Sequence, residues 1–180
     1  MQGFKLIGLV FKKNRTRYIL FYLLSLFFSV AEAQGQLPQP TGEIILKVSG
    51  NIQKSNIGKE AHFDLNMVKS MPISSITTET PWTDGPMEFE GVSLKYFLDY
   101  LGVSGIDIDA VSVDGHNVLI PIQDATDYPI IIAYQVYGED LIVGARGPLW
   151  VMYPFDDYPD TRSEIYEERA IWQVVKFNIN

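Results

Sequence analysis

The chain contains no cysteine, and this absence limits both how it can be stabilised and which chemistry it can perform. Exported domains are often held together by disulfide bonds, so a cysteine-free one must rely on its hydrophobic core. Hydrophobic residues make up 47% of the sequence, which is enough to build such a core. The same absence removes the soft thiolate ligand that many redox metals require.

The N-terminal residues have the three parts of an export signal. A basic start is followed by an apolar run of 13 residues, 18–30. A membrane-spanning helix needs about 20 residues, so a retained anchor is the weaker interpretation. Ala31-Glu32-Ala33 then supplies the small residues of a cleavage site. We expect residues 1–33 to be a signal peptide, cleaved after Ala33, and the protein to be periplasmic.

The rest of the chain has the length of one domain. Residues 34–42 are mostly polar and contain prolines, and we expect a flexible leader there, followed by a single domain over 43–180. The predicted signal carries five of the 14 basic and one of the 22 acidic residues, which leaves 9 positive and 21 negative charges, a net charge of −12. Such a field disfavours nucleic acid and anionic membrane surfaces as partners.

Local patterns predict more strands than helices. Asp64 is suited to cap a short helix running towards Met71, and Ser93 to cap a second helix that ends at Gly102. Asp114-Gly115 lies between two apolar segments, which predicts a β-hairpin. Apolar patterns predict further strands at 44–48, 130–133, 149–153 and 173–179. We therefore predict an α+β domain with a mixed β-sheet and short helices.

No motif indicates catalysis or metal binding. The two histidines, His62 and His116, are far apart, and we interpret them as ordinary loop or surface residues. Asp156, Asp157 and Asp160 do not have the spacing of a calcium loop. The sequence has neither a nucleophile elbow nor a glycine-rich phosphate loop, and nothing singles out a pair of carboxylates for glycoside cleavage. We expect no catalytic residue and no metal site.

A group of aromatic and charged residues suits a flat, polar heterocycle instead. Tryptophan and tyrosine offer faces for stacking. A carboxylate accepts paired N–H bonds from an amino-pyrimidine edge, and arginine donates in a fixed fork. Each residue also has a structural interpretation, such as packing in a strand or pairing with a surface acid. The candidates lie in the loop 81–85 and around the turn Gly147-Pro148: Trp82, Arg146, Trp150, Tyr153 and Asp156.

In the order and spacing of its landmarks, the segment 43–180 resembles the molybdopterin-binding domain of the sulfite oxidase fold. The resemblance implies that fold. It also adds Asp124 as a ligand-binding candidate, because the family places a loop there; a simple turn residue is an equal alternative. The landmarks are Phe89-Glu90-Gly91-Val92-Ser93-Leu94 with the helix after it, Val113-Asp114-Gly115-His116, Ile120-Pro121-Ile122, Ala133-Tyr134 with Gly138, residues 146–156, and Ile171-Trp172-Gln173-Val174.

The chain departs from that family at the metal. Family members bind molybdenum through a cysteine sulfur, whereas the corresponding loop here reads Thr78-Glu79-Thr80-Pro81-Trp82-Thr83. A hydroxyl is a poor replacement for a soft ligand, so we expect no molybdenum. The chain is more similar to small exported members of the fold that bind pterins without metal. That resemblance implies a pterin ligand and a membrane-bound signalling partner, including enzymes that make or degrade cyclic di-GMP.

Two other functions remain open at this point. One is a molybdopterin-dependent oxidoreductase without the usual cysteine ligand, which molybdenum analysis would reveal. The other is a pure interaction domain whose acidic residues, including Glu164, Glu167 and Glu168, dock on a basic partner. Added pterins would then leave its thermal stability unchanged, whereas a ligand that binds the folded state must raise it.

Overall fold

The computed structural model describes residues 36–142 and 144–180, and Leu37–Asn180 form one compact unit. The predicted signal peptide, its cleavage site after Ala33 and the first residues of the expected leader lie outside the described residues. Within the described part of the chain, no helix has the length and apolar character needed to cross a membrane. The predicted α+β class is confirmed by two β-sheets and a few short helices.

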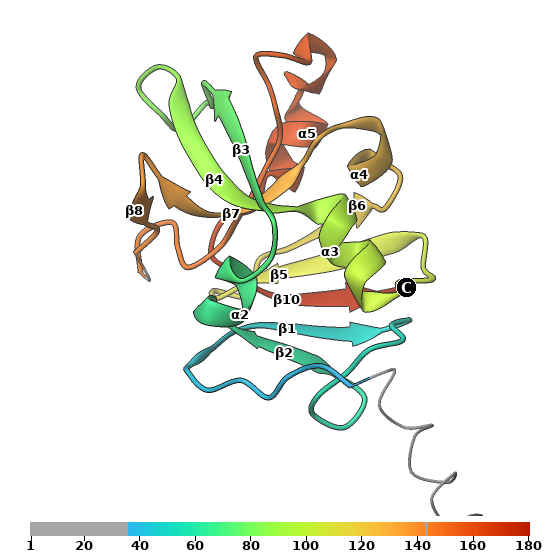
Figure 1. Cartoon of the computed structure of the whole chain (residues 1–180). Helices are drawn as coiled ribbons and strands as arrows, with labels where there is room; N and C mark the ends of the chain where they lie inside the picture. Colours follow the sequence, from blue (N-terminus) through green and yellow to red (C-terminus); the bar gives the residue numbers. More distant parts are fainter. Residues whose placement is uncertain (1–35, 143) are drawn as a thin grey trace, which may run out of the picture. The chain divides into compact units, whose positions relative to one another are not determined.

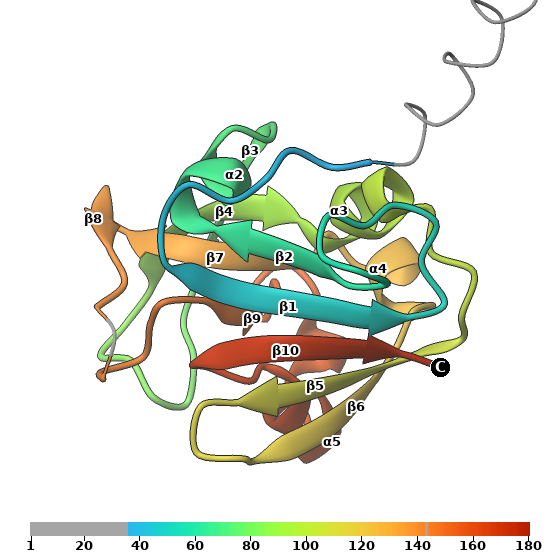
Figure 2. The same ribbon diagram turned by 90° about the horizontal axis from the view of Figure 1, so that it is seen from below.

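The first sheet is mixed, as predicted. Its second and third strands run parallel, with Lys47 opposite Lys176, and the remaining pairs are antiparallel. The predicted hairpin around Asp114-Gly115 forms one edge of this sheet. Figure 2 shows the strands in the order β2 (Ala61–Asp64), β1 (Ile44–Gly50), β10 (Val174–Ile179), β5 (Asp107–Ser112) and β6 (Asn117–Pro121).

The second sheet is antiparallel and lies across the core from the first (Figure 1). Gly91 allows two of its strands to approach closely, because a Cβ at this position would collide with the Ile132 carbonyl. The sheet contains β3 (Ile73–Thr78), β4 (Met87–Ser93), β7 (Ile131–Val136) and β8 (Glu139–Asp140), and β9 (Trp150–Met152) also pairs with β7.

Side-chain caps fix where the two predicted helices begin. Asp64 accepts a hydrogen bond from Met67 N, and Ser93 accepts one from Tyr96 N. Gly102 ends the second helix in the left-handed conformation, at φ 65°. The first helix ends at Lys69, two residues before the predicted Met71. The helical elements are α2 (Leu65–Lys69), α3 (Leu94–Leu101), α4 (Asp124–Asp127), the 3-10 turn η2 (Pro159–Thr161) and α5 (Glu164–Arg169).

Aromatic contacts between the sheets and α3 form the centre of the core. Phe97 on α3 lies 5.1 Å from Phe63 and 6.4 Å from Phe177, measured between ring centroids, and all three side chains are fully buried. Phe89 on β4 meets Trp150 on β9 edge to face at 5.5 Å. Burial of this apolar surface supplies the stabilisation that disulfide bonds cannot give to a cysteine-free chain.

The described part of the expected flexible leader is packed on the domain. Leu37 is buried, and its amide donates to the Ser55 carbonyl at 2.9 Å. The amides of Thr41 and Gly42 both donate to the Asp64 carboxylate, at 2.7 and 2.8 Å. The polar, proline-containing composition did not indicate this packing, because the hydrogen-bond acceptors for the segment belong to residues distant in the sequence, Ser55 and Asp64.

Asp64 therefore holds together the leader segment and α2, and its loss should be costly. Asp64→Ala is expected to lower the free energy of unfolding by roughly 1–3 kcal/mol, since a helix cap and an acceptor for two loop amides disappear together. Denaturation in urea measures this. Asp99→Ala, which removes a carboxylate from an exposed pair with Lys95, should change stability far less.

The same carboxylate should give an acid-dependent component of stability. Hydrogen bonds from the Met67 and Gly42 amides hold the pKa of Asp64 below its ordinary value. Its contribution is therefore complete above about pH 3.9, the unfolded value, and is lost as the pH falls through the lower folded pKa. In Asp64→Asn this part of the acid-induced decrease should be absent. An unchanged pH profile would show that the carboxylate charge is not what the amides recognise.

Candidate ligand site between Trp82 and Trp172

A tight loop between β3 and β4 presents the Trp82 side chain. Thr80 and Thr83 close the loop, since Thr80 N donates to Thr83 Oγ1 at 2.9 Å and Thr83 N to the Thr80 carbonyl at 3.2 Å. The Trp82 amide donates to Thr80 Oγ1 at 3.2 Å. The loop predicted from Pro81 and Gly85 is thus present, and it holds a half-buried indole at a defined position.

Three tryptophans meet beneath this loop. The ring centroid of Trp82 lies 5.0 Å from that of Trp172, with the ring planes 80° apart. The Trp150 ring lies 6.1 Å from Trp82 and 5.8 Å from Trp172. Trp150 is fully buried, and its Nε1 donates to the Ala170 carbonyl at 2.9 Å. Trp150 is therefore the base on which the two half-buried indoles rest, as expected for a residue of a strand.

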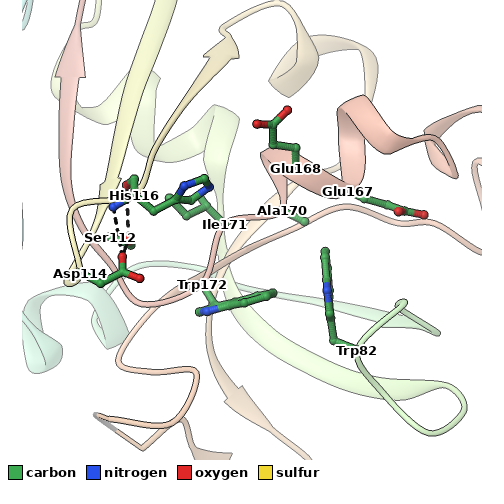
Figure 3. A pocket seen from close by; sticks show the side chains of 9 residues that line it. All are labelled: Trp82, Ser112, Asp114, His116, Glu167, Glu168, Ala170, Ile171 and Trp172. Carbon is green, nitrogen blue, oxygen red and sulfur yellow. Dashed lines mark hydrogen bonds between the residues drawn. The ribbon is translucent and has the colours of Figure 1, made fainter.

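A cavity of about 210 Å³ opens beside Trp82 and Trp172. Ligand pockets usually measure roughly 300–1,000 Å³, so this one fits a small ring system. In the view of Figure 3 the two indoles stand on one side, with Glu168 and His116 opposite. The lining residues come from the β3–β4 loop, the β5–β6 hairpin, α5 and the segment after it: Trp82, Ser112, Asp114, His116, Glu167, Glu168, Ala170, Ile171 and Trp172.

The hairpin turn contributes a fixed carboxylate to this cavity. Asp114 accepts hydrogen bonds from the Ser112 hydroxyl and, at 3.1 Å, from the His116 amide. These bonds hold the pKa of Asp114 below its ordinary value, and the group stays ionised. His116, which we interpreted as an ordinary turn residue, lies in this turn but also lines the cavity.

Arg146 lies outside this cavity and faces a second one of about 440 Å³. Its Nη2 donates to the Trp82 carbonyl at 2.6 Å, and its guanidinium stands over the Trp150 ring at 5.2 Å. The second cavity is wide and mainly apolar, with Met87, Phe89 and Leu141 among its lining residues beside Trp150. Arg146 is thus bonded to the Trp82 loop and lines the second cavity, not the one beside Trp172.

Asp124 and Tyr153 form a buried pair that attaches α5 to the domain. The Tyr153 hydroxyl donates to Asp124 Oδ2 at 2.8 Å, and Arg169 at the end of α5 donates to the same oxygen at 2.8 Å. Burial, followed by the negative charge of Asp124, raises the pKa of Tyr153 far above its ordinary value, so the phenol stays protonated. Neither Asp124 nor Tyr153 lines the cavity beside Trp82.

Asp156 is exposed and fixes the beginning of the Trp82 loop. It accepts from Glu79 N at 3.0 Å and pairs with Arg162, while its own amide donates to the Thr78 hydroxyl at 3.1 Å. Of the six candidate residues, Trp82 alone lines the pocket that it shares with Trp172. Arg146 and Trp150 line the second cavity instead, whereas Asp124, Tyr153 and Asp156 line neither of these two cavities.

Several lining residues did not stand out as ligand contacts in the sequence. Trp172 was one of the landmarks of the resemblance, and Glu167 and Glu168 belonged to an acidic segment. They come together because the chain turns back after α5, where the Trp150–Trp172 bridge returns it to the second sheet. No local pattern carries that information.

The residues of the loop do not fit a molybdenum centre. The chain offers no thiolate, and the hydroxyls of Thr78, Thr80 and Thr83 are engaged in hydrogen bonds within and around the loop. Over residues 36–142 and 144–180, no group of three or more histidine, aspartate or glutamate side chains is arranged to hold a metal ion.

The buried network around Asp124 should be a large contributor to stability. Asp124→Ala would leave the Tyr153 hydroxyl and the Arg169 guanidinium without their acceptor in a largely buried place, which costs about 2–4 kcal/mol. Chemical denaturation measures the loss. Asp127→Ala in the same helix removes an exposed carboxylate and should cost less than about 1 kcal/mol. Equal losses in the two variants would show that the network contributes no more than a surface residue does.

No protein-family model matches the chain, and no curated protein matches it. Among solved structures it is similar to the sulfane dehydrogenase SoxCD from Paracoccus pantotrophus, with a TM-score of 0.55 and 18% identity over 74% of this chain and 37% of that chain. The chain thus corresponds to well under half of that protein. At this identity the likeness concerns the fold, and it confirms the prediction of an α+β domain of the sulfite oxidase type.

Proposed function

We propose that the protein binds a pterin-class heterocycle in the cavity beside Trp82 and Trp172, without metal and without catalysis, and that a membrane-bound signalling protein responds to the occupied form. The observation that carries the proposal is the combination of two indole walls with carboxylates in a cavity of about 210 Å³. A flat bicyclic ring with an amino edge matches both features of this cavity.

Stacking on an indole provides the main contact with the ring. Trp82 and Trp172 stand 80° apart, so a planar ligand that stacks on one indole has its edge against the other. Edge-to-face and offset-stacked contacts are the favoured geometries between aromatic rings. Because buried Trp150 supports both indoles, the walls are in place before the ligand arrives, which lowers the entropic cost of binding.

Carboxylates provide the polar recognition. The amino group and ring N–H of a pterin are donors, and Glu167 and Glu168 on α5 supply acceptors at the rim of the cavity. Hydrogen bonds to charged groups are the stronger class, at roughly 1.5–3 kcal/mol. His116 is the cavity residue suited to donate to a ring nitrogen or carbonyl oxygen.

The proposal excludes redox turnover because the loop lacks a soft ligand for molybdenum. The alternative, an oxidoreductase without the usual cysteine, requires a bound metal. Metal analysis of protein produced in a molybdenum-replete host separates the two. Stoichiometric molybdenum would favour the oxidoreductase, and its absence alongside pterin binding would favour the proposal.

Helix α5 is the element through which occupancy would reach a partner. None of its residues is buried, and Arg169 and Tyr166 make its contacts with Asp124 and Tyr153. Because no residue of α5 is buried, the helix leaves a surface that a partner can reach. A ligand bound between Glu167 and Trp82 would connect α5 to the β3–β4 loop and favour one arrangement of this surface. The expected export of the chain would place that surface beside the outer segment of a membrane protein.

Trp82→Ala should weaken pterin binding about tenfold or more, because stacking of a base on an aromatic residue contributes roughly 1–3 kcal/mol. Titration of the intrinsic fluorescence of a pterin with purified protein measures the affinity. Trp82→Phe should retain part of it. Tyr96→Ala, which removes an exposed aromatic ring from α3, serves as the control and should bind like the original protein.

Bound pterin should also raise the unfolding temperature, because it stabilises the folded state alone. At a ligand concentration of 100 times Kd the free energy of unfolding should rise by about 2.7 kcal/mol. No thermal shift with any pterin, and variants indistinguishable from the original, would favour the interaction domain instead.

A further inference from the structure

The cavity beside Trp82 and Trp172 has an acidic lining. Asp114, Glu167 and Glu168 contribute three carboxylates, and no lysine or arginine stands among the described residues that line it. No ion pair joins Glu167 or Glu168 to a cation within residues 36–142 and 144–180. Their negative charge is therefore not neutralised by a neighbouring side chain of the described structure.

Two arginines that contact neighbours of this cavity bond to other partners. Arg146 donates to the Trp82 carbonyl at 2.6 Å and lines the second cavity. Arg169 follows Glu168 directly, but its guanidinium donates to Asp124 Oδ2 at 2.8 Å. Neither guanidinium lines the cavity beside Trp82 and Trp172. An anionic group on the ligand would therefore meet carboxylates and no cationic partner.

The aromatic walls add to the same preference. The face of an indole carries negative electrostatic potential and attracts cations, and tryptophan does so more strongly than tyrosine or phenylalanine. Trp82 and Trp172 present their indoles to the cavity that the carboxylates surround. A positively charged ring system would gain from the nearby negative charges in addition to stacking and hydrogen bonding, whereas a neutral ring lacks that charge–charge attraction.

From this arrangement we infer that the pocket selects planar nitrogen heterocycles that carry a positive charge, protonated or N-alkylated, and rejects phosphorylated ones. Glu167 and Glu168 are the residues that determine this specificity. The inference rests on the proposed function in taking the same cavity as the ligand site. It goes further because it states the charge of the ligand and excludes nucleotides and phosphorylated pterins.

Two matched pairs of probes test the charge preference in the purified protein. N-methylquinolinium, a planar cation, is compared with its uncharged parent quinoline, and 6-hydroxymethylpterin with its phosphomonoester. We expect the cation to bind about tenfold more tightly than quinoline and the phosphomonoester about tenfold more weakly than the alcohol, as charge-assisted contacts predict. Both affinity differences should become smaller at high salt, because the carboxylates lie at the solvent-exposed rim of the cavity, where dissolved ions screen their charge.

The double variant Glu167→Gln and Glu168→Gln should remove most of the affinity difference within each pair of probes. Glu164→Gln changes a carboxylate of the same helix that does not line the cavity, and the affinity differences should persist in this variant. Thermal unfolding verifies that each variant folds. The double variant keeps the size of both side chains, so a change in the cation-to-neutral ratio reports charge rather than shape.

The outcomes separate this inference from the proposed function. Equal binding within each pair, tighter binding of the phosphomonoester, or a double variant with unchanged ratios would overturn the charge preference, even if Trp82→Ala abolishes pterin binding. Binding of the cation with no affinity for any pterin would support the charge preference and refute the pterin function. Tetraethylammonium binding as tightly as the planar cation would overturn the requirement for a flat ring.

Discussion

The architecture of the candidate site depends on how Trp150 joins the second sheet to the chain after α5. Val151 N donates to the Ile171 carbonyl at 2.9 Å, and the Trp150 indole donates to the Ala170 carbonyl at 2.9 Å. These hydrogen bonds are buried, where an unpaired group is costly. They determine where α5 ends and where Trp172 emerges. The ligand-facing indoles and carboxylates are thus placed by contacts that the ligand itself does not touch.

The polar residues that position the site already have hydrogen-bond partners within the protein. The carboxylates of Glu167 and Glu168 are not used in this way within the described structure and can bind a ligand. Arg146 and Arg169 are bonded to the Trp82 carbonyl and to Asp124, and no buried side-chain nitrogen or oxygen among the described residues lacks a partner. A phosphorylated cofactor would need the opposite arrangement, with free cations beside the cavity. In the proposed function, the missing cysteine and the acidic cavity both suit a ligand that carries neither a metal nor phosphates.

Local signals predicted much of the fold, because caps and turns act within a few residues. Asp64, Ser93, Gly102 and the Asp114-Gly115 turn all lie where the sequence indicated. The site was harder to predict. A buried tryptophan such as Trp150 and a ligand-facing one look alike in a sequence, and the meeting of Trp82 with Trp172 depends on strand pairing between distant segments. The sequence could identify the aromatic and charged residues, but it could not show which of them line the cavity and which only position those that do.

The most direct measurement is a crystal structure of the protein soaked with a pterin. The proposed site requires the ring to stack on Trp82 or Trp172, with its amino edge towards Glu167 or Glu168 and with Arg146 still bonded to the Trp82 carbonyl. A ring bound in the second cavity, with its polar edge on Arg146 and the first cavity empty, would contradict the assignment of the ligand site.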